Sequence, residues 1–174
     1  MTVVIRPIKT SDVPAITRIY ALAVEHGTAS FELTPPDEVE MERRMQHLLS
    51  EGFPYLAAEV ANTLCGYAYA GPYRTRPAYR WTVEDSVYVA PDMSRRGIGR
   101  TLLDALIEAS TARGFRQMIA VIGDSTKQAA SIELHKALGF RHVGTLQNVG
   151  FKHDRWLDSV LMQRALGSGN AANP

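Results

Sequence analysis

Three arginines flank two glycines in the segment RRGIGR at residues 95–100, which follows a strand-like run and precedes a helical pattern. Glycines at such a turn let backbone N–H groups face a bound anion, toward which the positive end of the helix dipole also points. Arginine adds a planar fork that suits phosphate. The segment therefore predicts a site for a pyrophosphate-like group. A plain tight turn is the alternative, which would explain the glycines but not the arginines.

Two known phosphate-binding loops differ from this segment. The P-loop requires GxxxxGK[ST], and the dinucleotide fingerprint requires GxGxxG. Leu102 stands where the third glycine would be, and no Lys-Ser or Lys-Thr pair follows. Between residues 74 and 100 only three acidic residues oppose six arginines, which favours a small anionic ligand over a solvated charged surface. The six are Arg74, Arg76, Arg80, Arg95, Arg96 and Arg100.

Cysteine and histidine offer weaker candidates for chemistry. Cys65, the only cysteine, lies beside Gly66 in a predicted strand, where a small core residue is expected rather than a nucleophile. Four histidines lack the HxxxH or Cys-His spacing of metal sites, so no metal is predicted. They are His26, His47, His142 and His153.

The composition describes an ordinary soluble domain. The chain has 174 residues, 45% hydrophobic residues and a net charge of +1, which argues for one domain and against a nucleic-acid binder. No apolar run approaches the ~20 residues of a membrane span. The N-terminus lacks a signal-peptide pattern and a single cysteine excludes an internal disulfide, so we expect a reducing cytoplasm.

Strand and helix patterns alternate along the chain, which predicts a single α/β domain with a mixed sheet. In the segment 81–89 the side chains alternate, so that Asp85 and Glu84 point to opposite faces. The first helix can be capped by Ser11 or Thr10, and the second should bury Val39, Met45, Leu48 and Leu49. The expected order is strand 2–8, helix to Glu25, loop 26–32, helix 36–52, strands 54–61 and 64–71 with a turn at Asn62-Thr63, loop 71–80, strand 81–89, helix to Arg113 closed by Gly114, strand 117–122, helix 129–138, strands 141–147 and 156–164, and a tail from Gly167.

The segment 94–99 resembles the [QR]xxGx[GA] signature of the GNAT superfamily of acetyltransferases, with Ser94 in place of Gln or Arg. Four further blocks look like the phosphinothricin and methionine-sulfoximine N-acetyltransferase subfamily: TASFE (28–32), YRTRPAYRWTVEDSVYV (73–89), AASIELHKALGF (129–140) and VGFKHDRWLD (149–158). The resemblance implies a GNAT N-acetyltransferase domain over residues 1–166. Its fold would be α/β, a mixed, mostly antiparallel central sheet flanked by about four helices. Residues 167–174 would be a disordered tail.

The resemblance also implies which residues bind acetyl-CoA. Backbone groups of Val87, Tyr88 and Val89 would meet the pantetheine arm, as a peptide adds to a sheet edge. Gln128 stands where the family commonly has Asn, and Ser131 follows it. His135 stands where many members have a Tyr that protonates the leaving thiolate, a step that water could also perform. The pyrophosphate would lie on Arg95, Arg96, Gly97, Ile98, Gly99 and Arg100.

An amine acceptor needs a base, because a free amine is mostly protonated at pH 7. Glu84 suits that role, since it lies on the polar side of its strand, next to the proposed acetyl-CoA edge, and matches the acidic residue of the subfamily block. The alternative is a structural ion pair with Arg80 or Arg74. Asp85 points the other way and is less suited.

The resemblance places the acceptor among residues from three segments. Arg74 and Arg76 could grip its α-carboxylate or a tetrahedral side-chain group. Phe31 would line the pocket, although an aromatic ring there could equally be plain packing, and Trp156 is expected in the core. The implied substrate-binding set is Phe31, Glu32, Arg74, Thr75, Arg76, Glu84, Asp85 and Ser86.

These observations predict an N-acetyltransferase that moves an acetyl group from acetyl-CoA to the α-amino group of a small amino acid analogue, such as phosphinothricin or methionine sulfoximine or sulfone. Attack would be direct, through a tetrahedral intermediate. Acetylation of a peptide N-terminus or another amine is the alternative, as is a non-catalytic acyl-CoA sensor. The resemblance further implies a homodimer, and neither nucleic acid nor membrane is an expected partner.

Overall fold

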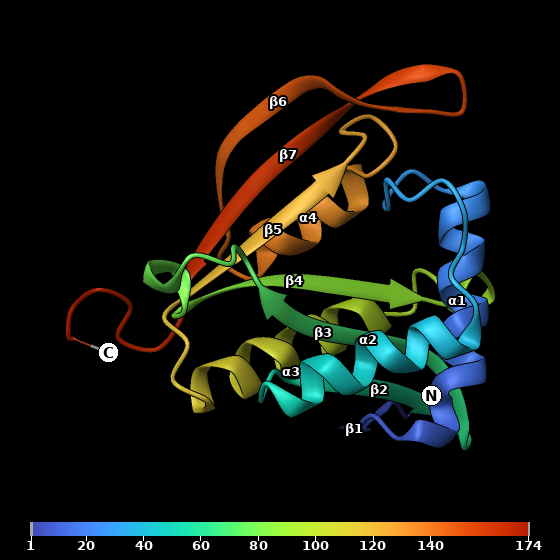
Figure 1. Cartoon of the computed structure of the whole chain (residues 1–174), viewed down its shortest axis with the longest axis horizontal. Helices are drawn as coiled ribbons and strands as arrows, with labels where there is room; N and C mark the ends of the chain where they lie inside the picture. Colours follow the sequence, from blue (N-terminus) through green and yellow to red (C-terminus); the bar gives the residue numbers. More distant parts are fainter. Residues whose placement is uncertain (1, 174) are drawn as a thin grey trace.

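A seven-stranded sheet with two helices on each face organises the computed structural model (Figure 1). The structure describes residues 2–173, so Met1 of the predicted domain and Pro174 of the predicted tail lie outside the described residues. The strands are β1 (Val4–Pro7), β2 (Tyr55–Val60), β3 (Thr63–Pro72), β4 (Thr82–Val89), β5 (Gln117–Gly123), β6 (Arg141–Lys152) and β7 (Arg155–Ala165). The helices are α1 (Val13–His26), α2 (Glu38–Ser50), α3 (Ile98–Ala112) and α4 (Ala129–Ala137).

The strands lie in the order β1-β2-β3-β4-β5-β7-β6, and every neighbouring pair is antiparallel except β4 and β5. A parallel pair needs a long crossover, and α3 supplies it between these two strands. The predicted mixed, mostly antiparallel sheet with four helices is confirmed.

Each sheet face has its own apolar core. Val83, Val87 and Val89 of β4 pack with the core that α3 and α4 cover. Tyr88, between them in sequence, packs with residues of α1 and α2 on the other face. The alternation predicted for residues 81–89 is therefore confirmed, and it gives the two faces of β4 different neighbours.

The sheet opens between β4 and β5. The two strands pair only from Thr82 to Glu84 against Gln117 to Ile119, and they then diverge toward their C-terminal ends (Figure 1). Backbone groups on the β5 side of residues 85–89 thus have no neighbouring strand. This wedge is where the chain leaves main-chain donors and acceptors available to a ligand.

Two turns differ from the sequence prediction. The hairpin turn lies at Ala61-Asn62 rather than Asn62-Thr63, and both residues have positive φ, 49° and 62°, as a two-residue hairpin turn requires. A short 3₁₀ helix precedes α1, and the Asp12 carboxylate accepts the Lys9 N–H at 2.8 Å, so neither Ser11 nor Thr10 caps the helix.

The predicted buried face of α2 is confirmed for Met45 and Leu48 and wrong for Val39 and Leu49. Asp37 caps the helix by accepting the Glu40 N–H, and the buried residues are Met41 and Met45. Val39 is 78% exposed and Leu49 is 38% exposed. The spacing from Met41 through Met45 to the partly buried Leu48 is the helical repeat that faces the sheet.

The last hairpin is longer than predicted. β6 continues to Lys152 and the turn is at His153-Asp154, both with positive φ. Trp156 is 62% exposed against Phe151, because the alternation of β7 points Leu157 inward instead, so its prediction as core was wrong. Cys65 is buried, as predicted. Disorder of the tail stays a prediction: the described part beyond Gly167 contains turns, including a Gly169 N–H to Leu166 C=O bond of 2.8 Å.

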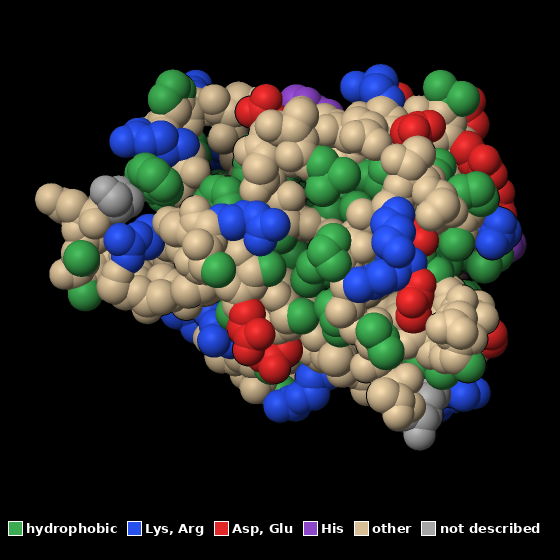
Figure 2. Space-filling model, turned by 90° about the horizontal axis from the view of Figure 1, so that it is seen from below, with side chains coloured by type: hydrophobic (Ala, Val, Ile, Leu, Met, Phe, Trp, Pro, Cys, Tyr) green, Lys and Arg blue, Asp and Glu red, His purple; other side chains and the backbone are tan. Residues whose placement is uncertain are grey.

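The face in Figure 2 carries Lys and Arg side chains scattered among Asp and Glu rather than gathered into one basic surface. This distribution agrees with the small net charge. None of the helices within residues 2–173 combines the length and apolar character needed to cross a bilayer.

Candidate active site

The arginine-glycine turn joins β4 to the first turn of α3. Its backbone bends through positive φ at Arg95 (60°) and at Gly97 (82°), which caps α3, and the space beside Gly97 is open. Glycine accepts this conformation without steric cost. The first N–H groups of a helix have no partner inside it, so those of α3 are available to an anion. Arg95, Arg96 and Arg100 are exposed around this turn.

The wedge between β4 and β5 forms a narrow cavity. Its walls are the strand edges at residues 86–88 and 120–122, and α4 forms its floor. Besides Asp85 and Ser86, the structure brings together here five residues predicted to act on or bind acetyl-CoA. They are Val87, Tyr88, Gln128, Ser131 and His135.

Glu84 borders a second cavity of about 270 Å³, on the α1 and α2 face of the sheet. The two cavities meet at five residues that line both: Ala29, Asp85, Ser86, Tyr88 and Val121. Burial raises the pKa of Glu84 to about 7, with a smaller contribution from the charge of Asp85. Within residues 2–173 no Lys, Arg or His forms an ion pair with Glu84, so the alternative pairing with Arg80 or Arg74 is not seen. A carboxylate with that pKa accepts a proton readily near neutral pH.

His135 and Asp85 form a buried pair on the other face of β4. The His135 Nε2 lies 3.0 Å from Asp85 Oδ2, and its Nδ1 lies 2.7 Å from the Ser131 carbonyl oxygen. His135 is 4% exposed and Asp85 is 8% exposed. Burial opposes a charge on the imidazole, but the bond to Asp85 outweighs it and raises the pKa of His135 above its usual value. The Asp85 side chain points to the face of β4 opposite Glu84 and bonds His135, although Asp85 also lines the Glu84 cavity. Its predicted part in substrate binding stays a prediction.

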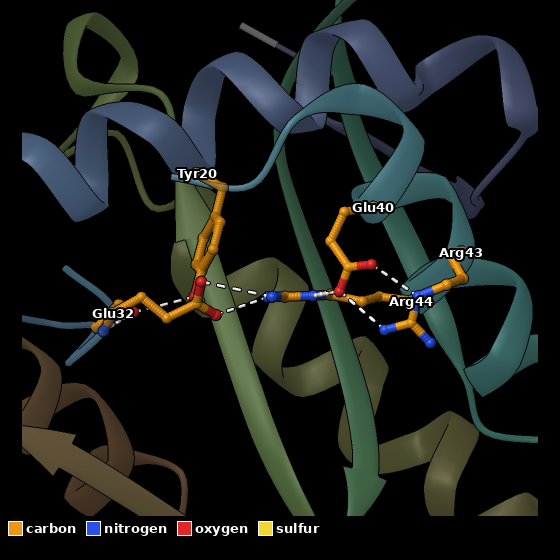
Figure 3. Close-up of polar contacts among 6 residues, drawn as sticks. Tyr20, Glu32, Glu40, Arg43 and Arg44 are labelled. Carbon is orange, nitrogen blue, oxygen red and sulfur yellow. Dashed lines mark hydrogen bonds and ion pairs between the residues drawn. The ribbon is translucent and has the colours of Figure 1, made fainter. Parts of the chain in front are cut away.

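Phe31 and Glu32 lie in the loop before α2 but face different surroundings. Phe31 lines the Glu84 cavity, and its ring is seated against Gly123 and Gly150, where a Cβ atom would lie within 2.6 Å of ring atoms. Glu32 accepts bonds from Tyr20 at 3.0 Å and from Arg44 at 2.6 Å (Figure 3). Glu32 therefore anchors this loop to α1 and α2 rather than lining the cavity.

Arg74, Thr75 and Arg76 lie in the loop between β3 and β4. They line an open cavity with Tyr79, and this cavity shares no lining residue with the one at Glu84. The Arg74 guanidinium stacks over the rings of Tyr73 and Tyr79, at 5.2 and 5.8 Å. Ser86, by contrast, lines the Glu84 cavity. The binding of an acceptor by the two arginines stays a prediction.

Sequence reasoning missed the residues that hold the loop over the end of the sheet. Asp124 is buried and accepts bonds from Thr28 at 2.8 Å, from Thr126 at 2.7 Å and from Arg155. Burial opposes its ionisation, but these donors together hold the pKa of Asp124 below its usual range. Lys152 donates to the Ser30 carbonyl at 2.8 Å. These partners are distant in sequence, and the only local signal was the polar segment after β5.

Comparison with known proteins fits this geometry. Residues 5–161 match the model of the acetyltransferase (GNAT) domain. The chain belongs to the GNAT family. The predicted fold and the predicted enzyme class, an acetyl-CoA-dependent N-acetyltransferase, are confirmed.

Relatives of this GNAT chain carry specific names. It is 52% identical over 170 residues to a phosphinothricin N-acetyltransferase of Alcaligenes faecalis, an alignment that covers 98% of this chain and 86% of that protein. It is 39% identical over 173 residues to the L-methionine sulfoximine/L-methionine sulfone acetyltransferase of Pseudomonas aeruginosa, with 99% of both chains covered.

Solved structures agree with the fold. A GNAT superfamily phosphinothricin acetyltransferase from Sinorhizobium meliloti, solved in complex with acetyl-CoA, superposes with a TM-score of 0.97 at 47% identity and covers 100% of this chain and 94% of that one. The structure of a putative acetyltransferase from Salmonella typhimurium, with its cofactor acetyl-CoA, gives a TM-score of 0.94 at 36% identity, with 100% and 98% covered. Within residues 2–173 of the present chain no cluster of three or more His, Cys, Asp or Glu is arranged to hold a metal ion.

Proposed function

We propose that this GNAT enzyme acetylates the α-amino group of a small amino acid analogue of the phosphinothricin or methionine sulfoximine and sulfone type. The observation that carries the proposal is Glu84, a partly buried carboxylate without a cation partner among the described residues, whose cavity meets the β4–β5 wedge. The names of the relatives at 52% and 39% identity support this acceptor class.

The residues of the turn and the wedge fit acetyl-CoA, which supplies an activated acetyl group when bound. Arg95, Arg96 and Arg100, with the N–H groups at Gly97, Ile98 and Gly99, would hold its pyrophosphate. The free backbone edge of Val87, Tyr88 and Val89 would bond the pantetheine arm, with Gln128 and Ser131 on the floor of the cavity.

Three groups of this chain would then act on the reaction. Glu84 accepts a proton from the acceptor amine as its nitrogen attacks the thioester carbonyl. A backbone N–H of the β4 edge donates to the carbonyl oxygen while negative charge develops on it. His135 supplies a proton to the thiolate that leaves. Attack is direct, so no acyl-enzyme forms.

The proposal includes a cytoplasmic homodimer. Support for a second copy comes from apolar side chains that the last two strands expose, which a single chain leaves in water. They are Val143, Leu146, Val149, Phe151 and Trp156.

A thiol-release assay tests the acceptor class. Acetyl-CoA would be offered with phosphinothricin, methionine sulfoximine, methionine sulfone, ordinary amino acids, spermidine and a peptide. Turnover of the first three, with a raised KM for them in Arg74→Ala, is expected. Turnover of spermidine or peptide alone would overturn the proposed acceptor class, while the chain would still be an acetyltransferase. Tight acetyl-CoA binding without any turnover would favour a sensor.

A further inference from the structure

We propose that Asp85 is a positioning residue that holds His135 doubly protonated, so that the buried pair delivers one proton to the leaving thiolate. The inference rests on the proposed function for the reaction it serves. It assigns to Asp85 a part in acid catalysis instead of substrate binding.

The partners of the imidazole fix where its protons lie. A backbone carbonyl only accepts, so the Nδ1 that faces the Ser131 oxygen at 2.7 Å carries a hydrogen. The Nε2 faces a carboxylate oxygen of Asp85 at 3.0 Å, which is also an acceptor when ionised. Both nitrogens therefore donate, and the ring bears a positive charge that the carboxylate neutralises.

Burial favours the state in which His135 carries a proton on both ring nitrogens while Asp85 is ionised. Both side chains are almost fully enclosed, and an isolated carboxylate there would be costly. The raised pKa of His135 agrees with this reasoning. Without Asp85 the same burial would favour the neutral ring.

Few other charges face the imidazole. The Phe140 ring packs against it in a T-shaped contact, at 4.9 Å between ring centres. The facing part of β5 at the cavity is Ala120, Val121 and Ile122. On α4 itself, Glu133 and Lys136 are paired with each other at 2.7 Å on the exposed side. From β4, Asp85 is the charge in contact, and Glu84 lies on the opposite face.

The pair lies where a thiol would be released. Asp85 and His135 line the wedge cavity together with the strand edge that the pantetheine arm would follow. The Asp85 Oδ1 is buried and makes no hydrogen bond within residues 2–173. That oxygen can accept a hydrogen bond while the pair changes its charge.

The proton transfers balance. The acceptor nitrogen forms its bond to the acetyl carbon, and Glu84 takes the nitrogen's proton. The carbon–sulfur bond breaks with its electron pair on sulfur, and sulfur takes the proton held between Nε2 and Oδ2. The pair is left as a neutral imidazole and a carboxylate, which solvent then reprotonates.

Kinetics with two acetyl donors test the role. Acetyl-CoA and its selenium analogue share every binding group, but the selenolate is a weaker base than the thiolate and leaves with less need of a proton. With acetyl-CoA, Asp85→Asn should lower kcat by about 10²-fold with KM for acetyl-CoA within about 3-fold, and His135→Gln should do the same. With the selenium donor both variants should stay within about 5-fold of the wild type. Asp85→Asn/His135→Gln should be no slower than either single variant, because the two act as one unit.

The pH profile gives a second readout. Loss of the Asp85 charge should move the alkaline limb of kcat to lower pH, because an imidazole without its counterion gives up its proton earlier. The proposal would be overturned if Asp85→Asn lowered kcat equally with both acetyl donors, or if the alkaline limb of the kcat profile stayed at the same pH. These comparisons use whichever amine the wild type acetylates, so a wrong acceptor class does not affect them.

Nuclear magnetic resonance of the wild-type chain needs no variant. The ring nitrogens of His135 should both carry protons at pH 7, and in Asp85→Asn the ring should be neutral at that pH. A neutral ring in the wild type at pH 7 would overturn the proposal whatever the kinetics.

Discussion

Glu84 and Asp85 are neighbours in sequence, but on opposite faces of β4 they have very different surroundings. Glu84 borders a cavity of about 270 Å³ that the loop at residues 29–31 also lines, and no cation is paired to it within residues 2–173. Asp85 faces α4 and is bonded to a histidine. Burial without a partner raises the pKa of Glu84 to about 7, whereas Asp85 is held as part of a neutral pair.

This difference shows how one strand can serve both proton transfers of a group transfer. The period of two along a strand sends consecutive side chains to opposite faces. A base on one face can then receive a proton while an acid on the other face gives one, with the strand edge between them. Whether a carboxylate on β4 acts as the base or as the partner of an acid therefore depends on the residues around it.

The largest expected effect comes from removing the base. Glu84→Gln keeps the shape but cannot accept a proton, so kcat should fall by about 10²–10⁴-fold with KM for acetyl-CoA little changed. In the wild type the activity should rise with pH through about 7, because Glu84 must be ionised to act. Steady-state thiol release from pH 5 to 9 measures both. Full kcat/KM in Glu84→Gln across that range would refute its role as base.

On the opposite face, breaking the buried pair should cost stability. Asp85→Leu removes the carboxylate that faces the His135 Nε2, so the buried ring gives up a proton and keeps an unpaired nitrogen, and the free energy of unfolding should fall by about 1–3 kcal/mol. Asp85→Leu/His135→Leu removes both charges and should recover most of that loss. Urea denaturation at pH 7 measures the cycle. A double variant as unstable as the sum of the single variants would mean that the two residues do not act as a pair.

Much of this contrast was accessible from the sequence. The alternation of WTVEDSVYV predicted that Glu84 and Asp85 point apart, and the glycines of the RRGIGR turn marked the start of α3. His135 was indicated by the resemblance to the GNAT superfamily, since it stands where many members have a Tyr.

Contacts between distant segments could not be predicted in the same way. Nothing near Asp85 in the sequence indicates His135, which is 50 residues away. The seat of Phe31 between Gly123 and Gly150 likewise depends on how β5 and β6 pack against a loop. Val39 and Leu49 of α2 show a related limit, since both are apolar but exposed, and which apolar side chains of a helix face the sheet depends on how the helix packs.

Substitutions on the two faces of β4 should change the free energy of unfolding in opposite directions. The fold raises the pKa of Glu84 from 4.5 to about 7, so it favours the neutral acid. The stabilisation is complete below pH 4.5, is lost as pH rises toward 7, and stays lost above it. Glu84→Gln should therefore stabilise the chain by about 1–2 kcal/mol at pH 8, after allowance for solvent screening, and by almost nothing at pH 4. Thermal unfolding at the two pH values measures this, and a loss of stability at pH 8 would contradict it.

The smallest expected effect concerns the ion pairs that hold the loop beside the Glu84 face. Arg44 bonds Glu32 and Glu40, but it is half-exposed, unlike the dry pair at Asp85 (Figure 3). Arg44→Met should cost only about 0.2–1 kcal/mol, and 1 M NaCl should remove most of the difference, since salt screens solvated charges. Arg43→Met, which loses only an exposed contact to Glu40, is the matched control and should be close to neutral. A salt-independent loss of several kcal/mol in Arg44→Met would show that the Glu84 face, like the Asp85 face, is stabilised by a buried ion pair. The two faces would then differ in the protons that Glu84 and His135 exchange, and not in the kind of contact that stabilises them.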